Sequence, residues 1–240
     1  MALLAKTNYF GNMISSAGWE CASTSENRSM GVVAEAPGPD GFIVAVESEG
    51  EQLAPNCEYI ATSTASLTNI VLGATNTISV GGTAKTFMLG SINIQTNAGS
   101  FPTMTVTGRQ VEDGGTGHCK CTLAGFLLDG LAHAQGFGLI SVSNGQLNSS
   151  TLGIETTIAT AEVDGEVKAS DLTGGKVTIS FDVIGVNDSG VVAVPTVDIL
   201  TPGGNVGTGV WTTPLTQSNP NGDFPRYSGT IEFPLKKDSN

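Results

Sequence analysis

The densest group of metal-binding residue types in this chain is His118-Cys119-Lys120-Cys121, with His133 further along. A structural zinc site needs four ligands, and its Cys or His pairs are separated by two to four residues. Cys119 and Cys121 are separated by one residue, so on a strand both side chains point to the same side. We interpret the group as small core residues beside a surface histidine, and we predict no metal and no other cofactor.

Gly81-Gly82 followed by Ala84-Lys85-Thr86 resembles the end of a phosphate-binding loop. That loop requires Gly directly before Lys and a helix after Thr, whereas here Ala84 precedes Lys85 and a strand pattern follows. The chain has no Gly-x-Ser-x-Gly segment of a hydrolase and no Gly-x-Gly-x-x-Gly segment of a dinucleotide-binding protein. Its 2 histidines leave few groups for acid–base catalysis. We therefore predict that the protein is not an enzyme and has no catalytic residues.

Glu47, Glu49 and Glu51 alternate at the end of a strand pattern, an arrangement that places three like charges along one face. Two interpretations stay open for this candidate acidic face. It is a solvated surface that keeps the protein soluble, or it is a wall whose negative charge has a function.

The chain has 240 residues, with 10 Lys and Arg against 22 Asp and Glu, a formal net charge of −12. This balance argues against a general nucleic-acid binder, because neutralising phosphates requires a basic surface. Charged residues are only 13% of the chain, whereas roughly 25% is average. Gly, Ser and Thr take their place. Lys236 and Lys237 at the C-terminal end are too few to indicate nucleic-acid or membrane binding.

The first six residues contain five apolar side chains and then a lysine, which is not the pattern of a secretory signal. The longest apolar runs, such as 42–46, are far shorter than the roughly 18 residues of a membrane span. We therefore expect a chain that is made in a cytoplasm and stays there unless an assembly machine or lysis moves it. Its 4 cysteines are then expected to be reduced.

Alternating residues predict a long β-hairpin over 85–111, with a loop over 97–102 and a bulge or bend at Gly90. In the first strand of this hairpin, Phe87 and Leu89 are predicted on one face, and Ile92 and Ile94, together with Met88, on the other. A second hairpin turn is predicted at 164–165, where Asp is followed by Gly. Further strands are predicted at 42–46, 119–123, 138–142, 158–163, 177–184, 191–199 and 227–233.

Only 126–134 has helical spacing, with Gly136 placed as a C-terminal cap. One short helix among about ten strands indicates a mainly β protein. The expected fold is an antiparallel β-sandwich or barrel with one short flanking helix near 125–135 and extended terminal arms. We divide the chain into an N-terminal arm (1–30), a β-sandwich core (31–200), and a loop, final strand and C-terminal tail (201–240). Neither 1–30 nor 202–226 shows a clean period.

The predicted surface is poor in the charges that keep a solitary β-protein from associating through its strand edges. There are ten basic residues in the whole chain, and the long strands are rich in Thr, Ser, Ile and Val. Centres of subunit interfaces are depleted in Lys, Glu and Asp. We therefore expect a homo-oligomer or polymer.

The long hairpin over 85–111 includes the return strand Phe101-Pro102-Thr103-Met104-Thr105-Val106-Thr107-Gly108, and a solitary helix follows the next strand. Together with the N-terminal arm and the C-terminal tail, this layout resembles that of the tube-forming (major tail) proteins of bacteriophages. The resemblance is one of layout over most of the chain. It implies a β-sandwich with a flanking helix, and six copies in a ring whose joined sheets line a channel. It also implies rings that stack, with arms and long loops bridging them.

The resemblance further implies a virion protein that assembles in the host cytoplasm. Its partners would be other copies of itself, other virion proteins, and DNA that passes without specific binding, with no membrane contact. An acidic channel wall would repel the phosphates of that DNA. The loop residues Phe101 and Pro102 are candidate inter-subunit contacts, and Glu47, Glu49 and Glu51 are the candidate acidic face.

Two other functions stay open. A capsid decoration or stabilising protein would share this composition but would form trimers or bind a shell without making tubes. A carbohydrate-binding β-sandwich would need exposed aromatic platforms, for which Trp19, Trp211 and a few tyrosines are available.

Overall fold

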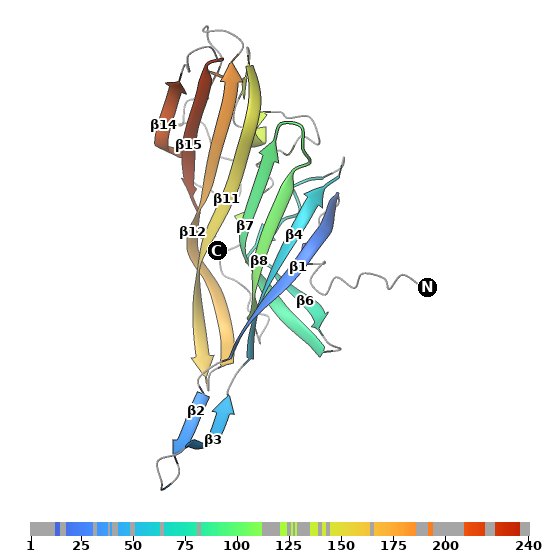
Figure 1. The fold of residues 1–240 in the computed structure, drawn as a ribbon, viewed down its shortest axis with the longest axis vertical. Coiled ribbons are helices and arrows are strands. Elements are labelled where there is room, and N and C mark those ends of the chain that lie inside the picture. The colour runs from blue at the N-terminus through green and yellow to red at the C-terminus, as the bar shows by residue number, and fades with distance from the viewer. Residues whose placement is uncertain are drawn as a thin grey trace, which may run out of the picture.

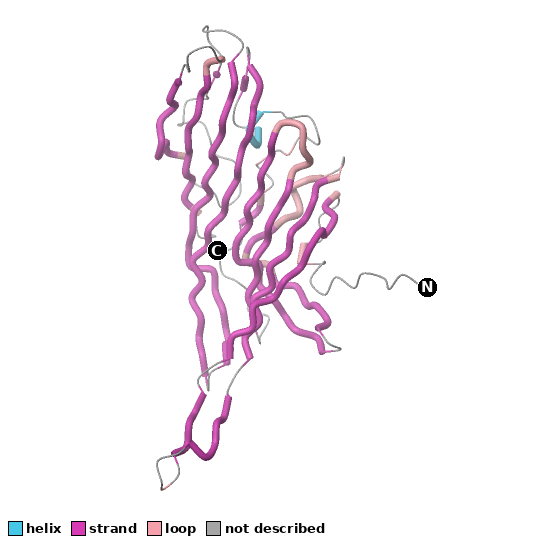
Figure 2. Tube along the Cα trace, in the orientation of Figure 1, coloured by secondary structure: helices cyan, strands magenta, loops and turns pink. Residues whose placement is uncertain are grey.

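The protein is described by a computed structural model that covers most of the chain. The described residues are 13–14, 18–30, 33–37, 39, 43–48, 51–62, 65–80, 83–111, 121–123, 126, 128, 135–138, 141–142, 145–163, 166–185, 192–193, 209–218 and 224–235. Within them the protein is almost entirely β-structure, as Figure 2 shows, which confirms the predicted fold class. The one helical segment described is the 3₁₀ turn η1 (Gln135–Gly138). Among these residues no helix has the length and apolar character needed to cross a membrane.

Nine strands form one antiparallel sheet that runs through the molecule (Figure 1). Their spatial order is β1-β4-β8-β7-β11-β12-β15-β14, and β6 pairs with β7 outside this path. The strands are β1 (Trp19–Met30), β4 (Glu51–Ala61), β6 (Thr75–Val80), β7 (Thr83–Asn97), β8 (Thr103–Val111), β11 (Gly145–Val163), β12 (Glu166–Gly185), β14 (Val210–Ser218) and β15 (Arg226–Pro234). The sheet is curved, because β12 contacts β8 and β4, which are not its neighbours in this order. The finer assignment to a sandwich or a barrel stays a prediction.

Three two-stranded ladders complete the described β-structure. They are β2 (Val33–Pro37) with β3 (Ile43–Ser48), β5 (Val71–Leu72) with β9 (Cys121–Thr122), and β10 (Ser141–Val142) with β13 (Val192–Ala193).

The hairpin predicted over 85–111 is confirmed by the pairing of β7 with β8, which runs from Thr86↔Val111 to Gln95↔Thr103. The register shifts between Leu89 and Ser91, so Gly90 lies in a β-bulge, as predicted. A bulge adds one residue and therefore changes which alternate positions face the core. Phe87 and Leu89 before the bulge lie in the same core cluster as Ile92 and Ile94 after it. The prediction that these two pairs lie on opposite faces is wrong for this reason.

β11 and β12 form a hairpin of 19 and 20 residues. Val163 pairs with Glu166 on either side of the predicted Asp-Gly turn, which itself lies outside the described residues. β11 pairs with β7 only over Ser149–Ile154, and β12 pairs with β15 only from Lys176 to Ile184. Residues 155–175 are therefore a two-stranded ribbon beyond the wide sheet, which we call ribbon B.

β1 and β4 form a second long hairpin. The β1–β4 pairing ends at Met30↔Glu51, and the β2–β3 pairing begins at Val33↔Ser48. Three residues separate these two pairs on each strand, so the β2–β3 ladder keeps the register of the β1–β4 ladder. β4 pairs with β8 only from Asn56 to Ile60. The described residues of 26–55 thus lie beyond the β4–β8 ladder, and we call them ribbon A. Both ribbons extend toward the lower end of the molecule in Figure 1.

The core lies on one face of the wide sheet, because alternate residues of its strands are apolar and buried. Loop residues that include Leu67, Ile70, Leu123 and Phe126 cover this face. Each large apolar side chain that is fully buried contributes roughly 1.5–3 kcal/mol. The central buried positions are Met104 and Val106 of β8, Leu152 and Ile154 of β11, Val177, Ile179 and Val183 of β12, and Ile231 and Phe233 of β15.

Two predicted boundaries are wrong. The last part of the predicted N-terminal arm is β1, which pairs with β4 from Trp19 to Met30. The predicted loop 202–226 contains β14, which pairs with β15. Both strands are rich in Ser and Thr, and both contain register shifts, between Cys21 and Ser23 in β1 and after Trp211 in β14. Bulges interrupt the alternation of apolar and polar residues on which the prediction of strands depends.

The helix predicted near 125–135 lies almost wholly outside the described residues, which include only Phe126, Leu128 and Gln135 of that range. η1 begins at its end. The strands predicted at 158–163, 177–184 and 227–233 are confirmed as parts of β11, β12 and β15. Of the predicted strand 191–199, only β13 is described.

Candidate functional site

The face of the wide sheet opposite the core is polar, and we call it the open face. Its side chains alternate with the buried ones along each strand, and all of them are half-exposed or exposed. In the six strands β4, β8, β7, β11, β12 and β15, only two of them are large and apolar, Ile60 and Ile184. Over these six strands the open face comprises Asn56, Glu58, Ile60, Ser91, Asn93, Gln95, Thr103, Thr105, Thr107, Arg109, Ser149, Thr151, Glu155, Lys176, Thr178, Ser180, Asp182, Ile184, Arg226, Ser228, Thr230 and Glu232.

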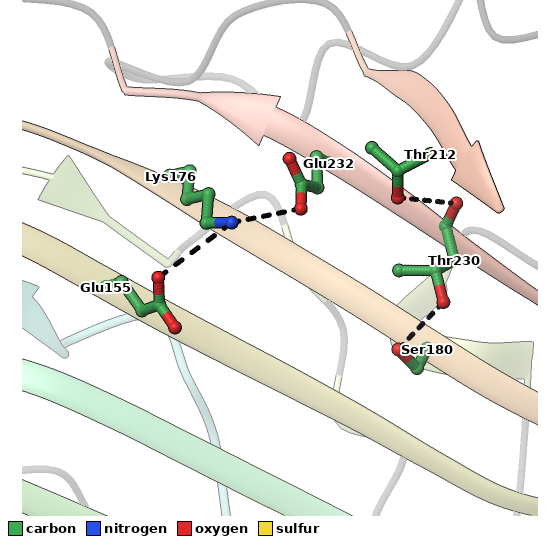
Figure 3. Close-up of polar contacts among 6 residues, drawn as sticks. All are labelled: Glu155, Lys176, Ser180, Thr212, Thr230 and Glu232. Carbon is green, nitrogen blue, oxygen red and sulfur yellow. Dashed lines mark hydrogen bonds and ion pairs between the residues drawn. The ribbon is translucent and has the colours of Figure 1, made fainter.

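Hydroxyl groups hydrogen-bond across neighbouring strands of the open face. Ser180 Oγ and Thr230 Oγ1 are 3.1 Å apart, and both are drawn in Figure 3. Ser91 and Thr107 pair in the same way between β7 and β8, at 2.5 Å. Such cross-strand pairs contribute roughly 0.2–1 kcal/mol each. Uncharged groups therefore help to fix the strand register of this face.

One ion group spans three strands of the open face (Figure 3). Lys176 Nζ of β12 lies 3.1 Å from Glu232 Oε1 of β15 and 3.9 Å from Glu155 Oε2 of β11. The hydrogen bond and charge of Glu232, followed by the charge of Glu155, raise the pKa of the Lys176 ammonium. The lysine stays protonated, so it balances the charge of one of its two neighbouring carboxylates. Over these six strands the open face carries four carboxylates, Glu58, Glu155, Asp182 and Glu232, against three basic groups, Arg109, Lys176 and Arg226.

Two segments of the sequence hold most of its negative charge. Residues 26–55 include six acidic residues and one basic residue, and residues 155–175 include five and one. Their charges of −5 and −4 make up nine of the twelve net negative charges, and three of these acidic residues, Asp40, Glu49 and Asp164, lie outside the described residues. Of the predicted acidic face, Glu47 lies in β3 and Glu51 in β4, both within ribbon A. These two glutamates thus lie in a ribbon whose described residues include four carboxylates and one basic group.

The candidate inter-subunit loop joins β7 to β8 at the other end of the molecule (Figure 1). Its two predicted residues differ in exposure: Phe101 is 54% exposed, whereas Pro102 is buried. The Pro102 carbonyl accepts a hydrogen bond from Ala61 N at 2.9 Å, and Ala98 N donates to the Asn148 carbonyl at 2.8 Å. These bonds hold the loop from both sides, so that it presents the ring of Phe101 to solvent.

A cleft of about 400 Å³ opens where β11 leaves β7. Its only titratable lining residue is Arg109, and its hydroxyl groups come from Ser91, Thr107 and Thr156. Gly90 and Gly108 line it as well. The remaining lining is Leu53, Ala54 and Ile158. This set offers hydroxyl groups without a neighbouring base to activate them, so it is not the arrangement of a nucleophilic active site.

The predicted cysteine–histidine group is largely untested. His118, Cys119, Lys120 and His133 lie outside the described residues, and Cys121 belongs to β9. Within the part of the chain that is described, no three side chains of His, Cys, Asp or Glu come together to hold a metal ion.

The tryptophans that a carbohydrate site would use are packed against the protein. Trp19 is 9% exposed and donates its Nε1–H to the Ser66 carbonyl at 3.0 Å. Trp211 lies edge-on to Phe181, with ring centroids 6.0 Å apart. Tyr59 and Tyr227 are buried. None of these four rings is the exposed platform on which sugar binding depends.

Sequence reasoning missed the Lys176 ion group and the concentration of charge in the ribbons. The charge was visible in the sequence, since the acidic residues gather in 26–55 and 155–175. The ion group was not, because it depends on the pairing of β12 with β15, strands that are far apart in the chain. Known proteins offer no guide: no protein-family model matches the chain, and no curated protein is significantly similar to it.

Proposed function

We propose that this chain is a non-enzymatic structural protein of a virion, assembled from identical copies in the host cytoplasm. In this proposal the copies form rings, the rings stack into a phage tail tube, and DNA passes through the tube without specific binding. The chain needs no cofactor and no membrane for this role. The ring number, six, comes only from the resemblance in layout described above.

The observation that carries the proposal is the open face. A wall that conducts DNA has to be wettable and must not grip phosphates, so polar uncharged groups and an excess of carboxylates suit it. The open face has hydroxyl and amide groups over most of its area and four carboxylates against three basic groups. It also lacks the aromatic side chains on which bases would stack.

The edges of the sheet support self-assembly. β1 and β14 are the outermost strands of the path; neither contains a lysine, and β14 has no charged residue at all. The ribbons support it as well, because each is a ladder of only two strands, which is marginally stable without further packing. Contact with a neighbouring copy would stabilise both. Head-to-tail contacts of this kind produce open stacks.

The main alternative is a capsid decoration or stabilising protein. It rests on the same edges and ribbons but places them against a shell. A carbohydrate-binding module is a weaker alternative, because its candidate tryptophans are packed.

Negative-stain electron microscopy and sedimentation of the purified protein over a range of concentrations test the proposal. We expect rings or hollow filaments, with a sedimentation profile that shifts to larger species as concentration rises. Compact trimers without filaments would favour the decoration protein. A lone compact monomer at high concentration would overturn self-assembly altogether.

A further inference from the structure

Sulfur atoms gather at one side of the core, where Met13 lies against strands β4, β6 and β8. Cys57 Sγ of β4 lies 3.6 Å from Met13 Sδ, and both residues are only 1% exposed. Cys21 of β1 packs against the same core and is half-buried.

The strand register places the second cysteine beside the first. Cys21 pairs with Tyr59, and Cys57 precedes Tyr59 by two residues, so Cys57 and Tyr59 face the same side of β4. Cys21 is therefore a diagonal neighbour of Cys57 across the β1–β4 ladder. Cys21 Sγ donates a hydrogen bond to the Ser23 carbonyl at 3.6 Å, an acceptor that it would leave on turning toward Cys57.

Met13 is held in place by several contacts, so its sulfur has a defined position. Its carbonyl accepts a hydrogen bond from Asn76 Nδ2 at 2.7 Å. Its terminal methyl group occupies the space beside Gly108, where even a β-carbon would collide with it. The absence of a side chain at position 108 thus lets the thioether reach Cys57.

We propose that Met13, Cys21 and Cys57 bind one soft monovalent cation of the Cu(I) class. Thiolate and thioether sulfurs are the ligands that select Cu(I), whereas harder ions prefer oxygen or imidazole. Three sulfurs around one ion at about 2.3 Å are roughly 4 Å apart, so the observed separation of Met13 and Cys57 requires only a small adjustment. On binding, the ion replaces the thiol protons of both cysteines, which go to solvent, and Met13 donates a lone pair.

The site is closed on the core side and reachable from the sheet edge. Met13 and Cys57 are almost fully buried, whereas Cys21 lies on the outermost strand β1 and is partly exposed. An ion would therefore enter past Cys21 and, once bound, tie β1 and the 13–14 segment to β4. The inference does not depend on the proposed virion function.

The test uses the full chain, reduced and without oxygen, with Cu(I) supplied against the coloured chelator bicinchoninate. Ag(I), which does not change oxidation state, serves as a second probe. The variant Met13→Leu keeps the volume of the side chain and removes its sulfur, and Cys57→Ser removes the central ligand. The matched control is the double variant C119S/C121S, which removes the other two thiols and leaves the site intact.

We expect the wild type and C119S/C121S to bind one ion per chain and to gain thermal stability from it. M13L should lose at least about ten-fold in affinity, because one of three ligands is gone. C57S should no longer hold Cu(I) against bicinchoninate. Circular dichroism of the ion-free variants checks that they fold. If C57S does not fold, M13L and Cys21→Ser decide the question. Binding that survives unchanged in M13L, or that disappears in C119S/C121S, overturns the site.

Discussion

The ammonium of Lys176 lies 3.1 Å from the carboxylate of Glu232 at the point where β12 begins to pair with β15. Glu155, 3.9 Å away on the third strand, is the first residue of ribbon B. The ion group therefore lies at the boundary between the wide sheet, which packs on the core, and ribbon B, which begins where the ladders of β11 with β7 and of β12 with β15 end. It is also the one place on the open face where a described lysine balances the acidic excess.

Replacing Lys176 by Met should leave the fold intact and lower Tm slightly, because exposed ion pairs contribute little to stability. The loss should be larger in 20 mM than in 1 M NaCl, since salt screens exposed charges. Glu232→Gln should reproduce most of the loss, and Glu155→Gln, whose carboxylate is more distant, less of it. Thermal unfolding followed by circular dichroism measures all three variants.

The same ion group has a defined pH dependence. Glu232 raises the pKa of Lys176 in the folded protein, so the stabilisation is complete below the ordinary pKa of lysine and is lost as pH rises through the raised one. The Tm difference between wild type and Lys176→Met should accordingly disappear in strongly alkaline buffer. A difference that neither salt nor alkali changes would show that Lys176 acts by packing instead.

Gly229 should not tolerate a methyl group. A β-carbon at this position would lie 2.7 Å from Trp211 Cζ3 and 3.1 Å from Phe181 Cζ, both on rigid rings. Gly229→Ala should therefore cost about 1–3 kcal/mol in the free energy of unfolding, as overpacked core positions do. The control is Gly153→Ala on the open face, where the nearest atom would be 3.9 Å away.

Urea denaturation measures both glycine variants. Gly153→Ala should be neutral or stabilising by up to about 1 kcal/mol, since alanine restricts the unfolded chain more than glycine does. Equal stabilities of the two variants would mean that Trp211 and Phe181 do not pack over β15 as described.

Local patterns predicted the parts of the fold that depend on neighbouring residues. The β7–β8 hairpin and the turn flanked by Val163 and Glu166 followed from alternation and from turn residues. β1 and β14 were missed, because their residues are mostly polar and their bulges break the period. Phe87 and Leu89 were placed on the wrong face for the same reason, since a bulge changes every later position in its strand.

The candidate surface was predictable only in part. The exposed ring of Phe101 and the acidic run around Glu47 could be proposed from the sequence, because turns and charges are local features. The open face could not, since it arises from the pairing of strands as distant as β7 and β11. The contact between Met13 and Cys57 could not be predicted from the sequence either, because these residues are 44 positions apart.

Cys57 should resist thiol reagents in the folded protein. Burial, followed by the charge of Cys21, raises the pKa of the Cys57 thiol from 9.0 to about 12. At pH 8 its reactive thiolate fraction is then about a thousand-fold smaller than that of an ordinary cysteine. Labelling with an aromatic disulfide reagent and mass spectrometry should show slow modification at Cys57 and faster modification at the half-exposed Cys21.

The raised pKa of Cys57 also predicts a loss of stability in alkali. Between about pH 9 and pH 12 the unfolded thiol ionises while the folded one keeps its proton, so unfolding becomes more favourable as pH rises.

Labelling of Cys57 in urea should be fast, which serves as the control for the thiol reagent. Fast labelling of Cys57 without denaturant would contradict the burial described here.

Replacing Phe101 tests assembly separately from folding. Because Phe101 is 54% exposed, Phe101→Ser should change the free energy of unfolding by no more than about 0.5 kcal/mol. If the β7–β8 loop is a subunit contact, the same variant should shift the sedimentation profile toward smaller species and reduce the number of filaments seen by microscopy. Phe224, which is 57% exposed, provides the matched control: Phe224→Ser removes a similar apolar area from the segment before β15. Assembly that is lost in Phe101→Ser and kept in Phe224→Ser places the contact at the loop. Assembly that is kept in Phe101→Ser removes this loop from the interface, whatever the fate of Phe224→Ser.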